Sequence, residues 1–412
     1  VRDGVRRPGS VLPSGLILAC ILLAVALYMV FFRKSITQVI TDSTAPGGTQ
    51  TGTLPSANTG TPGGTTSGTT PDGSTEPGRL TPSRTANGGS TFTTLLTNTS
   101  IESPTVTADG TVAYYDPADG KFYTIDATGN VTTLSNISFP KADNVTFDSG
   151  ATTAVIEFPD GSNVVYDFES AKQITLPSHW ESFSFSADGE EIAAKSIGTD
   201  ASNRALVITS ADGSSTQVIA ALGDNDEKVS VSWSPNDSVL GFSATGVNTG
   251  GTFGRQEIYL IGPDGQATGA LFVDGNNFHN IWSPDGNNLL YSVADPADNY
   301  KAALWYADSR GDRSGNSRRR MGIKTTVDKC TFASATTVYC GVPREMPSGG
   351  GSDSSAITAF DDVYKLNVST GNASLTAIPA ADTRIFSPSV SPDGAYLYYT
   401  DGSGRLNVIR LQ

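Results

Sequence analysis

Residues 282–294 read WSPDGNNLLYSVA, and residues 390–402 repeat the pattern as VSPDGAYLYYTDG. In both stretches Ser-Pro-Asp-Gly stands between runs of apolar and β-branched side chains. Proline presets φ at the first turn position, aspartate accepts hydrogen bonds from its own turn, and glycine supplies a positive φ. Each stretch therefore predicts a tight hairpin that joins two β-strands.

Related turns recur about 40 to 60 residues apart, a spacing typical of four-stranded repeat units. The looser copies are TADG (107–110), FDSG (147–150), SADG (186–189), SPND (234–237) and FASA (332–335). A third strand and a short outer strand follow, as in KFYTIDATG (121–129) and VTTLS (131–135). Together with the two SPDG copies, these repeats predict an all-β, seven-bladed β-propeller of four-stranded antiparallel blades.

The strand–SPDG–strand unit resembles the TolB-like and related WD-type β-propeller repeats of bacterial envelope proteins. The resemblance covers residues 91–412 and is weakest at the second and sixth copies, FDSG and FASA. It implies the fold and an envelope setting, but no particular activity, because this repeat serves unrelated functions. The final repeat ends at its third strand, so we expect residues 91–98, TFTTLLTN, to complete the seventh blade and avoid an open edge.

The chain is acidic, with 27 Lys and Arg against 41 Asp and Glu and a formal net charge of -14. This balance argues against a nucleic-acid partner, whose phosphates require a basic surface. Three Cys and two His are too few for a multi-metal protein, and no phosphate-binding glycine loop is present. We therefore expect no cofactor and no metal.

The N-terminal region has a different composition from the repeats. Residues 14–32 form a run of 19 without a charge, long enough for a membrane-spanning helix. Basic residues flank the run, and their slight excess before it favours a cytoplasmic N-terminal tail over residues 1–13. A cleaved signal peptide is the alternative. Residues 33–90 are rich in Gly, Thr, Ser and Pro and predict a disordered linker, which leaves 91–412 as an extracytoplasmic propeller.

The residues three positions before the end of each innermost strand are expected to face the axial channel, because alternate strand residues share a face. Five of these seven are Ser or Asn, which we interpret as small packing residues, whereas His279 and Lys329 interrupt the ring. These two, together with Trp180 and Lys228, are the candidate axial binding residues.

Cys330 and Cys340 flank the sixth turn symmetrically, which places them opposite each other across a hairpin and predicts a disulfide. A disulfide implies an oxidising compartment, and two buried free thiols are the alternative. Residues 309–324 form a basic loop that is a candidate clamp for an anionic partner, or else a solvated loop. Its cations are Arg310, Arg313, Arg318, Arg319, Arg320 and Lys324.

No catalytic constellation stands out, because no triad-forming elbow or zinc spacing is present. DPADG (116–120) and DPADN (295–299) are interpreted as β-turns, with calcium binding as the alternative. The sequence favours a non-enzymatic, membrane-anchored binding or scaffold module for an envelope protein or cell-wall glycan. A glycan-directed hydrolase or lyase that uses acidic residues of the axial channel is the alternative function.

Overall fold

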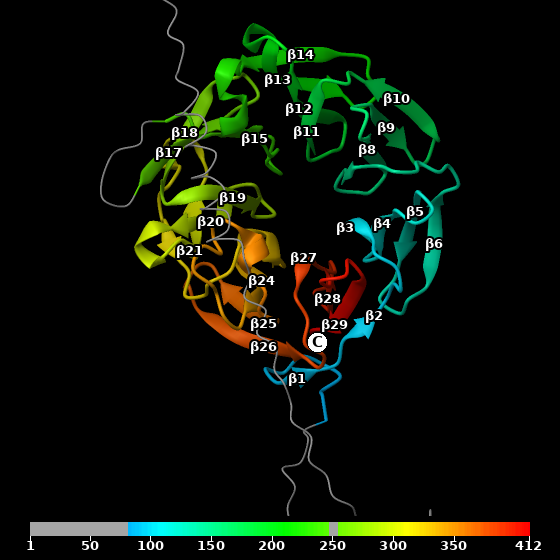
Figure 1. Ribbon diagram of the computed structural model, residues 1–412, viewed down its shortest axis with the longest axis vertical. Coiled ribbons are helices and arrows are strands. Elements are labelled where there is room, and N and C mark those ends of the chain that lie inside the picture. Colours follow the sequence, from blue (N-terminus) through cyan, green and yellow to red (C-terminus); the bar gives the residue numbers. More distant parts are fainter. Residues whose placement is uncertain (1–80, 247–253) are drawn as a thin grey trace, which may run out of the picture. The chain divides into compact units, whose positions relative to one another are not determined.

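The computed structural model describes residues 81–246 and 254–412, and these form a seven-bladed β-propeller (Figure 1). The predicted fold class is therefore confirmed. The predicted N-terminal tail, the apolar run 14–32 and residues 33–80 of the predicted linker lie outside the described residues. Within the described residues, no helix is long and apolar enough to span a membrane.

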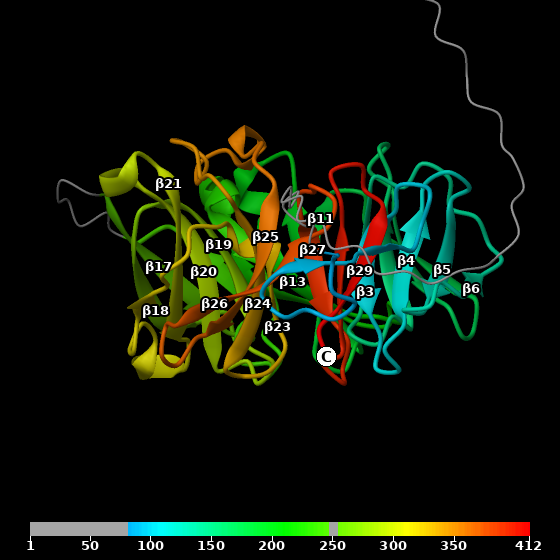
Figure 2. The same ribbon diagram turned by 90° about the horizontal axis from the view of Figure 1, so that it is seen from below.

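Each blade is an antiparallel sheet whose innermost strand faces the axis, and the strands run between the two faces of the propeller (Figure 2). The first three blades run in chain order. Blade 1 contains β3 (Glu102–Val106), β4 (Val112–Asp116), β5 (Lys121–Ile125) and β6 (Val131–Ser135). Blade 2 contains β7 (Asn144–Phe147), β8 (Thr153–Glu157), β9 (Asn163–Asp167) and β10 (Lys172–Leu176). Blade 3 contains β11 (Trp180–Phe185), β12 (Glu191–Ile197), β13 (Arg204–Ser210) and β14 (Thr216–Ala221).

The remaining blades follow the same plan. Blade 4 contains β15 (Val229–Val231), β16 (Gly241–Ser243), β17 (Arg255–Ile261) and β18 (Ala267–Asp274). Blade 5 contains β19 (Asn276–Trp282), β20 (Asn288–Asp295), β21 (Lys301–Asp308) and β22 (Arg319–Arg320). Blade 6 contains β23 (Cys330–Phe332), β24 (Thr337–Pro343), β25 (Asp361–Asn367) and β26 (Ala373–Pro379). Blade 7 contains β27 (Phe386–Val390), β28 (Tyr396–Thr400) and β29 (Leu406–Arg410).

Six short 3-10 helices lie in the connections. They are η1 (Ala201–Asn203), η2 (Gly223–Lys228), η3 (Pro296–Asp298), η4 (Gly311–Arg313), η5 (Val327–Lys329) and η6 (Ser354–Ala356). Two of them, η2 and η5, lead directly into the innermost strands β15 and β23, so they set the direction of the side chains that enter the axial region.

The ring closes through residues 83–95, which we call the closure segment. Strand β2 (Thr94–Leu95) pairs antiparallel with β29 and becomes the outer strand of blade 7, which confirms the predicted closure. Strand β1 (Ser90–Thr91) adds a fifth, parallel strand to β26 of blade 6. Residues 83–90, which the composition assigned to the linker, are thus part of the folded unit. The buried amide of Leu406 donates to Thr97 Oγ1 at 2.9 Å and fastens this seam.

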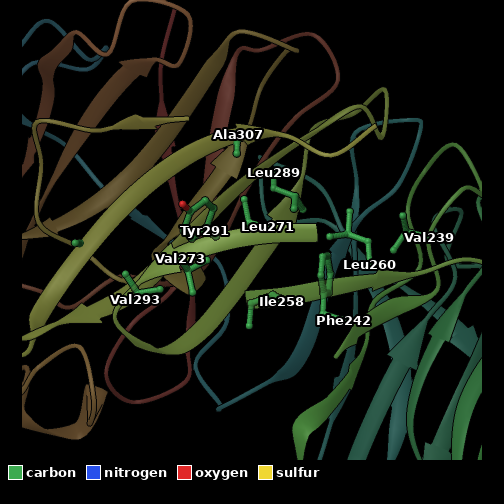
Figure 3. Packing of buried hydrophobic residues seen from close by; sticks show 11 residues of the cluster. Val239, Phe242, Ile258, Leu260, Leu271, Val273, Leu289, Tyr291, Val293 and Ala307 are labelled. Carbon is green, nitrogen blue, oxygen red and sulfur yellow. The ribbon is translucent and has the colours of Figure 1, made fainter. Parts of the chain in front are cut away.

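The hydrophobic core lies between neighbouring blades. The largest cluster joins β16–β18 of blade 4 to β20 and β21 of blade 5 and includes Phe242 and Tyr291 (Figure 3). The middle strands are buried on both faces, so β20 is almost continuously apolar rather than alternating. Burying each large side chain contributes about 1.5–3 kcal/mol, which makes blade stacking the main source of stability.

The repeated turns make the contacts that their sequence predicts. In blade 5 Ser283 Oγ donates to Asp285 Oδ1 at 2.6 Å and accepts from Asn288 N at 3.0 Å. Gly286 has φ +66°, a conformation that glycine adopts without strain. In the degenerate second copy the buried Asp148 replaces the serine, and its Oδ1 accepts from the amides of residues 152 and 153, each at 2.7 Å.

Alternate blades differ in their innermost strands. Those of blades 1, 3, 5 and 7 contain a β-bulge, whereas those of blades 2, 4 and 6 pair without one. Each bulge holds one residue at positive φ: Ser103, Ser182, Asn277 and Ser387. We expected side chains of the innermost strands to alternate between the two faces. This expectation fails at Ser103, Ser182 and Ser387, because each of these serines lies in the bulge itself. In blade 5 the bulge precedes His279, which keeps its register opposite Ser292.

Candidate axial binding cleft

A cleft of about 620 Å³ opens between the innermost strands of blades 4 and 5. It brings together two of the four predicted axial residues, His279 on β19 and Lys228 at the end of η2. Both side chains are exposed. The remaining polar lining consists of amides, hydroxyls and one carboxylate, namely Asn276, Asn277, Asn280, Gln256, Ser230, Ser232 and Glu227.

The bulge in β19 positions the histidine. Asn277 takes φ +56° in the bulge, and its Nδ2 donates to the Gly351 carbonyl oxygen at 2.8 Å. Its Oδ1 lies 3.2 Å from His279 Nε2, so the amide orients the imidazole. On the other wall Lys228 Nζ donates to Asn225 Oδ1 at 3.1 Å. Hydrogen bonds thus hold His279 and Lys228 on the two sides of one cleft.

The cleft is chemically a hydrogen-bonding surface. Strands β15 and β19 each pair on one side only, so their inner backbone edges face the axis without a neighbouring strand. The asparagine side chains of β19 offer both donors and acceptors beside its edge, and Ser230 offers a hydroxyl on β15. Glu227 is the single carboxylate of the lining, so the pair required for glycosidase chemistry is missing from this cleft.

Lys329 is not a channel-lining residue, which corrects the sequence interpretation. It ends η5 instead of belonging to β23, and its side chain is 2% exposed. Its Nζ lies 2.6 Å from Oδ2 of Asp361, which is fully buried, and 5.0 Å from the centre of the Phe386 ring. Asp361 Oδ2 also accepts from the amide of Ile385 at 2.7 Å. Burial raises the pKa of Asp361, an effect that Lys329 and this amide partly offset.

Trp180 is likewise a core residue instead of an axial ligand site. It is 8% exposed and packs between blades 2 and 3 with Phe183 and Val155. Its carbonyl oxygen accepts from Asn163 Nδ2 at 2.8 Å, which joins blade 2 to the start of β11. A strand-initial Trp in the inner region of a propeller therefore acts here as a spacer between two blades.

The small hydroxyl residues of the inner strands join neighbouring blades. Ser184 Oγ of blade 3 accepts from the amide of Trp233 in blade 4 at 3.0 Å. Ser232 Oγ of blade 4 accepts from Trp282 Nε1 of blade 5 at 2.9 Å. These hydroxyl groups therefore connect each blade to the next.

Five of the six cations of the basic loop form ion pairs within the chain. Arg310 and Arg313 share Asp308 at 2.6 and 3.5 Å, and Arg318 pairs with Asp274. The other cations of the loop have partners in other segments: Arg320 with Asp295 at 2.9 Å, Lys324 with Asp298 at 2.5 Å, and Arg319 with the Thr370 carbonyl oxygen at 2.7 Å. An anionic partner would have to compete with these internal contacts, which disfavours the loop as a binding site.

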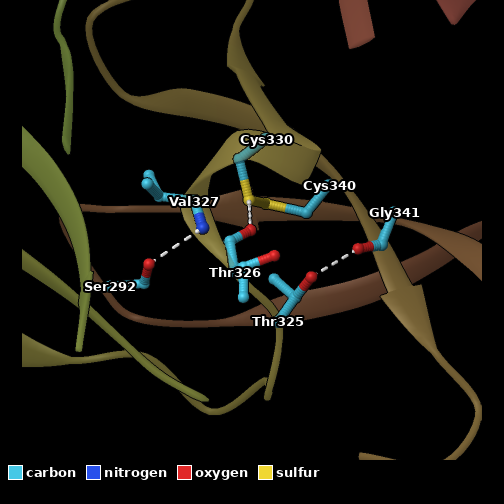
Figure 4. The surroundings of a disulfide bond; sticks show 7 residues. All are labelled: Ser292, Thr325, Thr326, Val327, Cys330, Cys340 and Gly341. Carbon is cyan, nitrogen blue, oxygen red and sulfur yellow. Dashed lines mark hydrogen bonds between the residues drawn. A yellow bond between two sulfur atoms is a disulfide. The ribbon is translucent and has the colours of Figure 1, made fainter. Parts of the chain in front are cut away.

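The predicted disulfide between Cys330 and Cys340 is present (Figure 4). The two residues are directly opposed in the β23–β24 hairpin, with a Cα–Cα distance of 4.1 Å. Both are buried in the cluster between blades 5 and 6. The bridge therefore stabilises the hairpin whose turn, alone among the seven repeated turns, lacks both Pro and Gly.

The two DPAD segments form turns in which the first aspartate accepts a local hydrogen bond. Asp116 and Asp295, which begin the two DPAD segments, each accept from an amide two residues later, both at 2.9 Å. Among residues 81–246 and 254–412, no group of three or more His, Cys, Asp or Glu side chains could hold a metal ion.

The sequence matches no protein-family model and no curated protein. Solved structures do match. An oligogalacturonate lyase in complex with manganese is 13% identical over 78% of this chain and 93% of its own, with a TM-score of 0.52. The Cps50 (Swd1) β-propeller domain of Myceliophteria thermophila is 11% identical over 78% and 100%, also at 0.52. A chain of the mitotic checkpoint complex is 14% identical over 83% and 96%, again at 0.52. These likenesses show the fold alone.

Sequence reasoning missed the amide groups of the cleft. Asn276, Asn277 and Asn280 surround His279 within five residues of one innermost strand, which is a detectable local signal. Gln256 gave no such signal, because it lies on a different strand and reaches the cleft only through the folding of blade 4.

Proposed function

We propose that this protein is a non-enzymatic binding module whose axial cleft holds an extended segment of an envelope protein. The observation that carries the proposal is the cleft itself, which has two unpaired strand edges and, beside the β19 edge, the amide side chains of Asn276, Asn277 and Asn280. An extended peptide presents alternating donors and acceptors, and both the edges and the amides complement that pattern.

A peptide fits this cleft better than a glycan does. Sugar rings stack on exposed aromatic faces, but Phe242 is 1% exposed and Phe278 is half-buried. The glycan-directed hydrolase or lyase is also less favoured, because Glu227 has no second carboxylate beside it in the cleft lining.

The proposal includes the placement of the protein. Residues 14–32 would anchor the chain in the cell membrane, with residues 1–13 cytoplasmic and the propeller extracytoplasmic. The buried disulfide supports an oxidising compartment, and the resemblance of the repeats to TolB-like propellers supports the envelope. Retention in the membrane after alkaline washing tests the anchor, and release of the intact chain would contradict it.

Site-specific photo-crosslinking in native membranes tests the binding function. A photo-reactive amino acid at His279 is expected to capture one protein through a short peptide, identifiable by mass spectrometry. The matched control position is Val218, which is 66% exposed on the outer strand β14. A synthetic copy of the captured peptide should bind the wild type and lose affinity for the K228S/H279S variant. Equal capture at Val218, or unchanged peptide affinity in that variant, would contradict the proposal.

A further inference from the structure

A second cavity lies at the seam between blades 7 and 1 and is built from both ends of the folded unit. Its volume is about 460 Å³, within the range of small-ligand pockets. The closure segment, residues 83–95, contributes Arg84 and Phe92 to its lining. The other lining residues include Arg410 and Val408 of β29, Tyr396 of β28, and Ala127 of blade 1.

Neither arginine of this cavity forms an ion pair with a described carboxylate side chain, a property that they share with Arg319 and Arg384. Eight other arginines of the described residues form ion pairs, whereas Arg84 and Arg410 have no carboxylate side chain of the described residues within 4.0 Å. Arg410 Nε donates to the Gln412 backbone oxygen at 2.8 Å, which leaves its two terminal nitrogens available. Two guanidinium groups that line one cavity attract a carboxylate or phosphate.

The cavity also has an apolar, partly aromatic wall beside the arginines, because Tyr396 pairs with Arg410 across β28 and β29. Phe92 is 48% exposed, and its amide is held by the Ser83 carbonyl oxygen at 2.9 Å. Tyr396 is half-buried and Val408 buried beside it. An inorganic anion would leave this wall in contact with water. A ring with an apolar face would cover it, as sugars do when they stack on aromatic side chains.

An adjoining pocket of about 380 Å³ shares Ala127 and Tyr396 with the first and has the opposite charge. Its carboxylates belong to Asp109, Asp126 and Asp393. Hydrogen bonds from neighbouring hydroxyl, amide and backbone groups hold the pKa of each below its usual value, so all three stay ionised. This half of the groove accepts hydrogen bonds from neutral hydroxyls and repels a second anion.

We propose that this seam groove binds an acidic glycan in which a uronate ring alternates with a neutral sugar ring. The uronate carboxylate pairs with Arg84 and Arg410 and its ring covers Phe92, while the neutral ring donates hydroxyls to the aspartates. The site is separate from the axial cleft and takes a different class of ligand, so it goes beyond the function proposed above.

Calorimetric titration of the full chain with a hyaluronan tetrasaccharide, in which glucuronate alternates with N-acetylglucosamine, tests the proposal. Saturable binding is expected, and R84Q and R410Q should each weaken it by about tenfold, the effect of losing one charge-assisted hydrogen bond. The matched control is R319Q, which removes an equal charge from an exposed arginine outside the groove. It should bind like the wild type. No binding, or an equal loss in R319Q, would overturn the proposal.

Two further probes separate the parts of the site. Chitotetraose, which has no carboxylate, should bind at least about tenfold more weakly, and inorganic phosphate should not compete at equal concentration. Equal affinity for either probe would overturn the assignment to a uronate glycan. F92A is expected to weaken the tetrasaccharide while it leaves the thermal unfolding midpoint within a few degrees of wild type. The K228S/H279S variant should bind the tetrasaccharide normally, which keeps this test independent of the axial cleft.

Discussion

Removing one partner of the buried Lys329–Asp361 ion pair should destabilise the propeller far more than removing both. Both side chains are at most 2% exposed, and the Nζ–Oδ2 distance is 2.6 Å. At an effective dielectric constant of about 20 the attraction at this distance is about 6 kcal/mol, and desolvation of the two ions opposes it. The pair connects η5 to β25 of blade 6 and, through the amide of Ile385, to the start of blade 7.

K329M and D361N should each lower the free energy of unfolding by about 3–5 kcal/mol, because each leaves an uncompensated charge in the core. The K329M/D361N variant keeps an acceptor for the Ile385 amide and should lie within about 2 kcal/mol of wild type. The expected coupling energy of the double-mutant cycle is therefore about 3 kcal/mol or more.

The free energies can be measured by urea unfolding of the full chain, monitored by the fluorescence of its four tryptophans. K329M adds a pH test. Burial already raises the folded-state pKa of Asp361, and loss of the lysine raises it further. The deficit of K329M should therefore be small near pH 4 and grow as the pH rises through that raised pKa. Single-variant losses below about 1 kcal/mol, or losses that simply add in the double variant, would refute the reasoning.

Three other predictions concern the blades and their closure. The C330S/C340S variant should lose about 3 kcal/mol, since the bridge closes a short loop with a sequence separation of 10; full stability in that variant would contradict this. T97A should cost about 1–3 kcal/mol, because it leaves the buried Leu406 amide without an acceptor; T97S, which keeps the hydroxyl, is the control. The pKa of Asp285 is lowered chiefly by the Ser283 hydroxyl, so its stabilisation is present above pH 3.8 and lost below it. Acid unfolding of D285N should therefore be less steep than that of wild type, and identical curves would exclude this contribution.

The features that sequence predicted correctly are those that local chemistry determines. The Ser-Pro-Asp-Gly turn contains its own hydrogen-bond partners, so a copy such as 283–286 predicts a hairpin without knowledge of the rest of the chain. The disulfide followed from the equal spacing of Cys330 and Cys340 about a turn, because paired antiparallel residues are related by symmetry about it. Closure followed from the strand that the last repeat lacked.

The features that sequence missed depend on departures from regular strands. Lys329 was assigned to a strand face, but η5 extends to residue 329 and turns its side chain toward Asp361, 32 residues later. No local pattern identifies that partner. Trp180 begins a strand, and only the packing of blade 3 on blade 2 decides that its ring is buried. His279 kept its predicted exposure because the bulge lies before it.

Composition also misplaced the start of the folded unit. Residues 83–90 contain Gly, Ser, Thr and Asn and have few apolar side chains, so they cannot form a core of their own. Their order comes from backbone hydrogen bonds to strands formed elsewhere: Gly88 N donates to Thr376 O at 2.8 Å and Ala86 N donates to Arg410 O at 2.9 Å.

The closure segment, residues 83–95, connects closure of the ring to the seam groove. It covers the exposed edge of blade 6 with β1, completes blade 7 with β2, and carries Arg84 and Phe92 into the groove. A ligand that contacts Arg84 and Arg410 together therefore binds only the closed ring. By linkage, such a ligand must stabilise closure by an amount that grows with the logarithm of its concentration above Kd. Ligand binding in the groove and pairing of β2 with β29 are consequently linked equilibria. The tetrasaccharide should therefore no longer stabilise the folded propeller in any variant that releases β2 from β29.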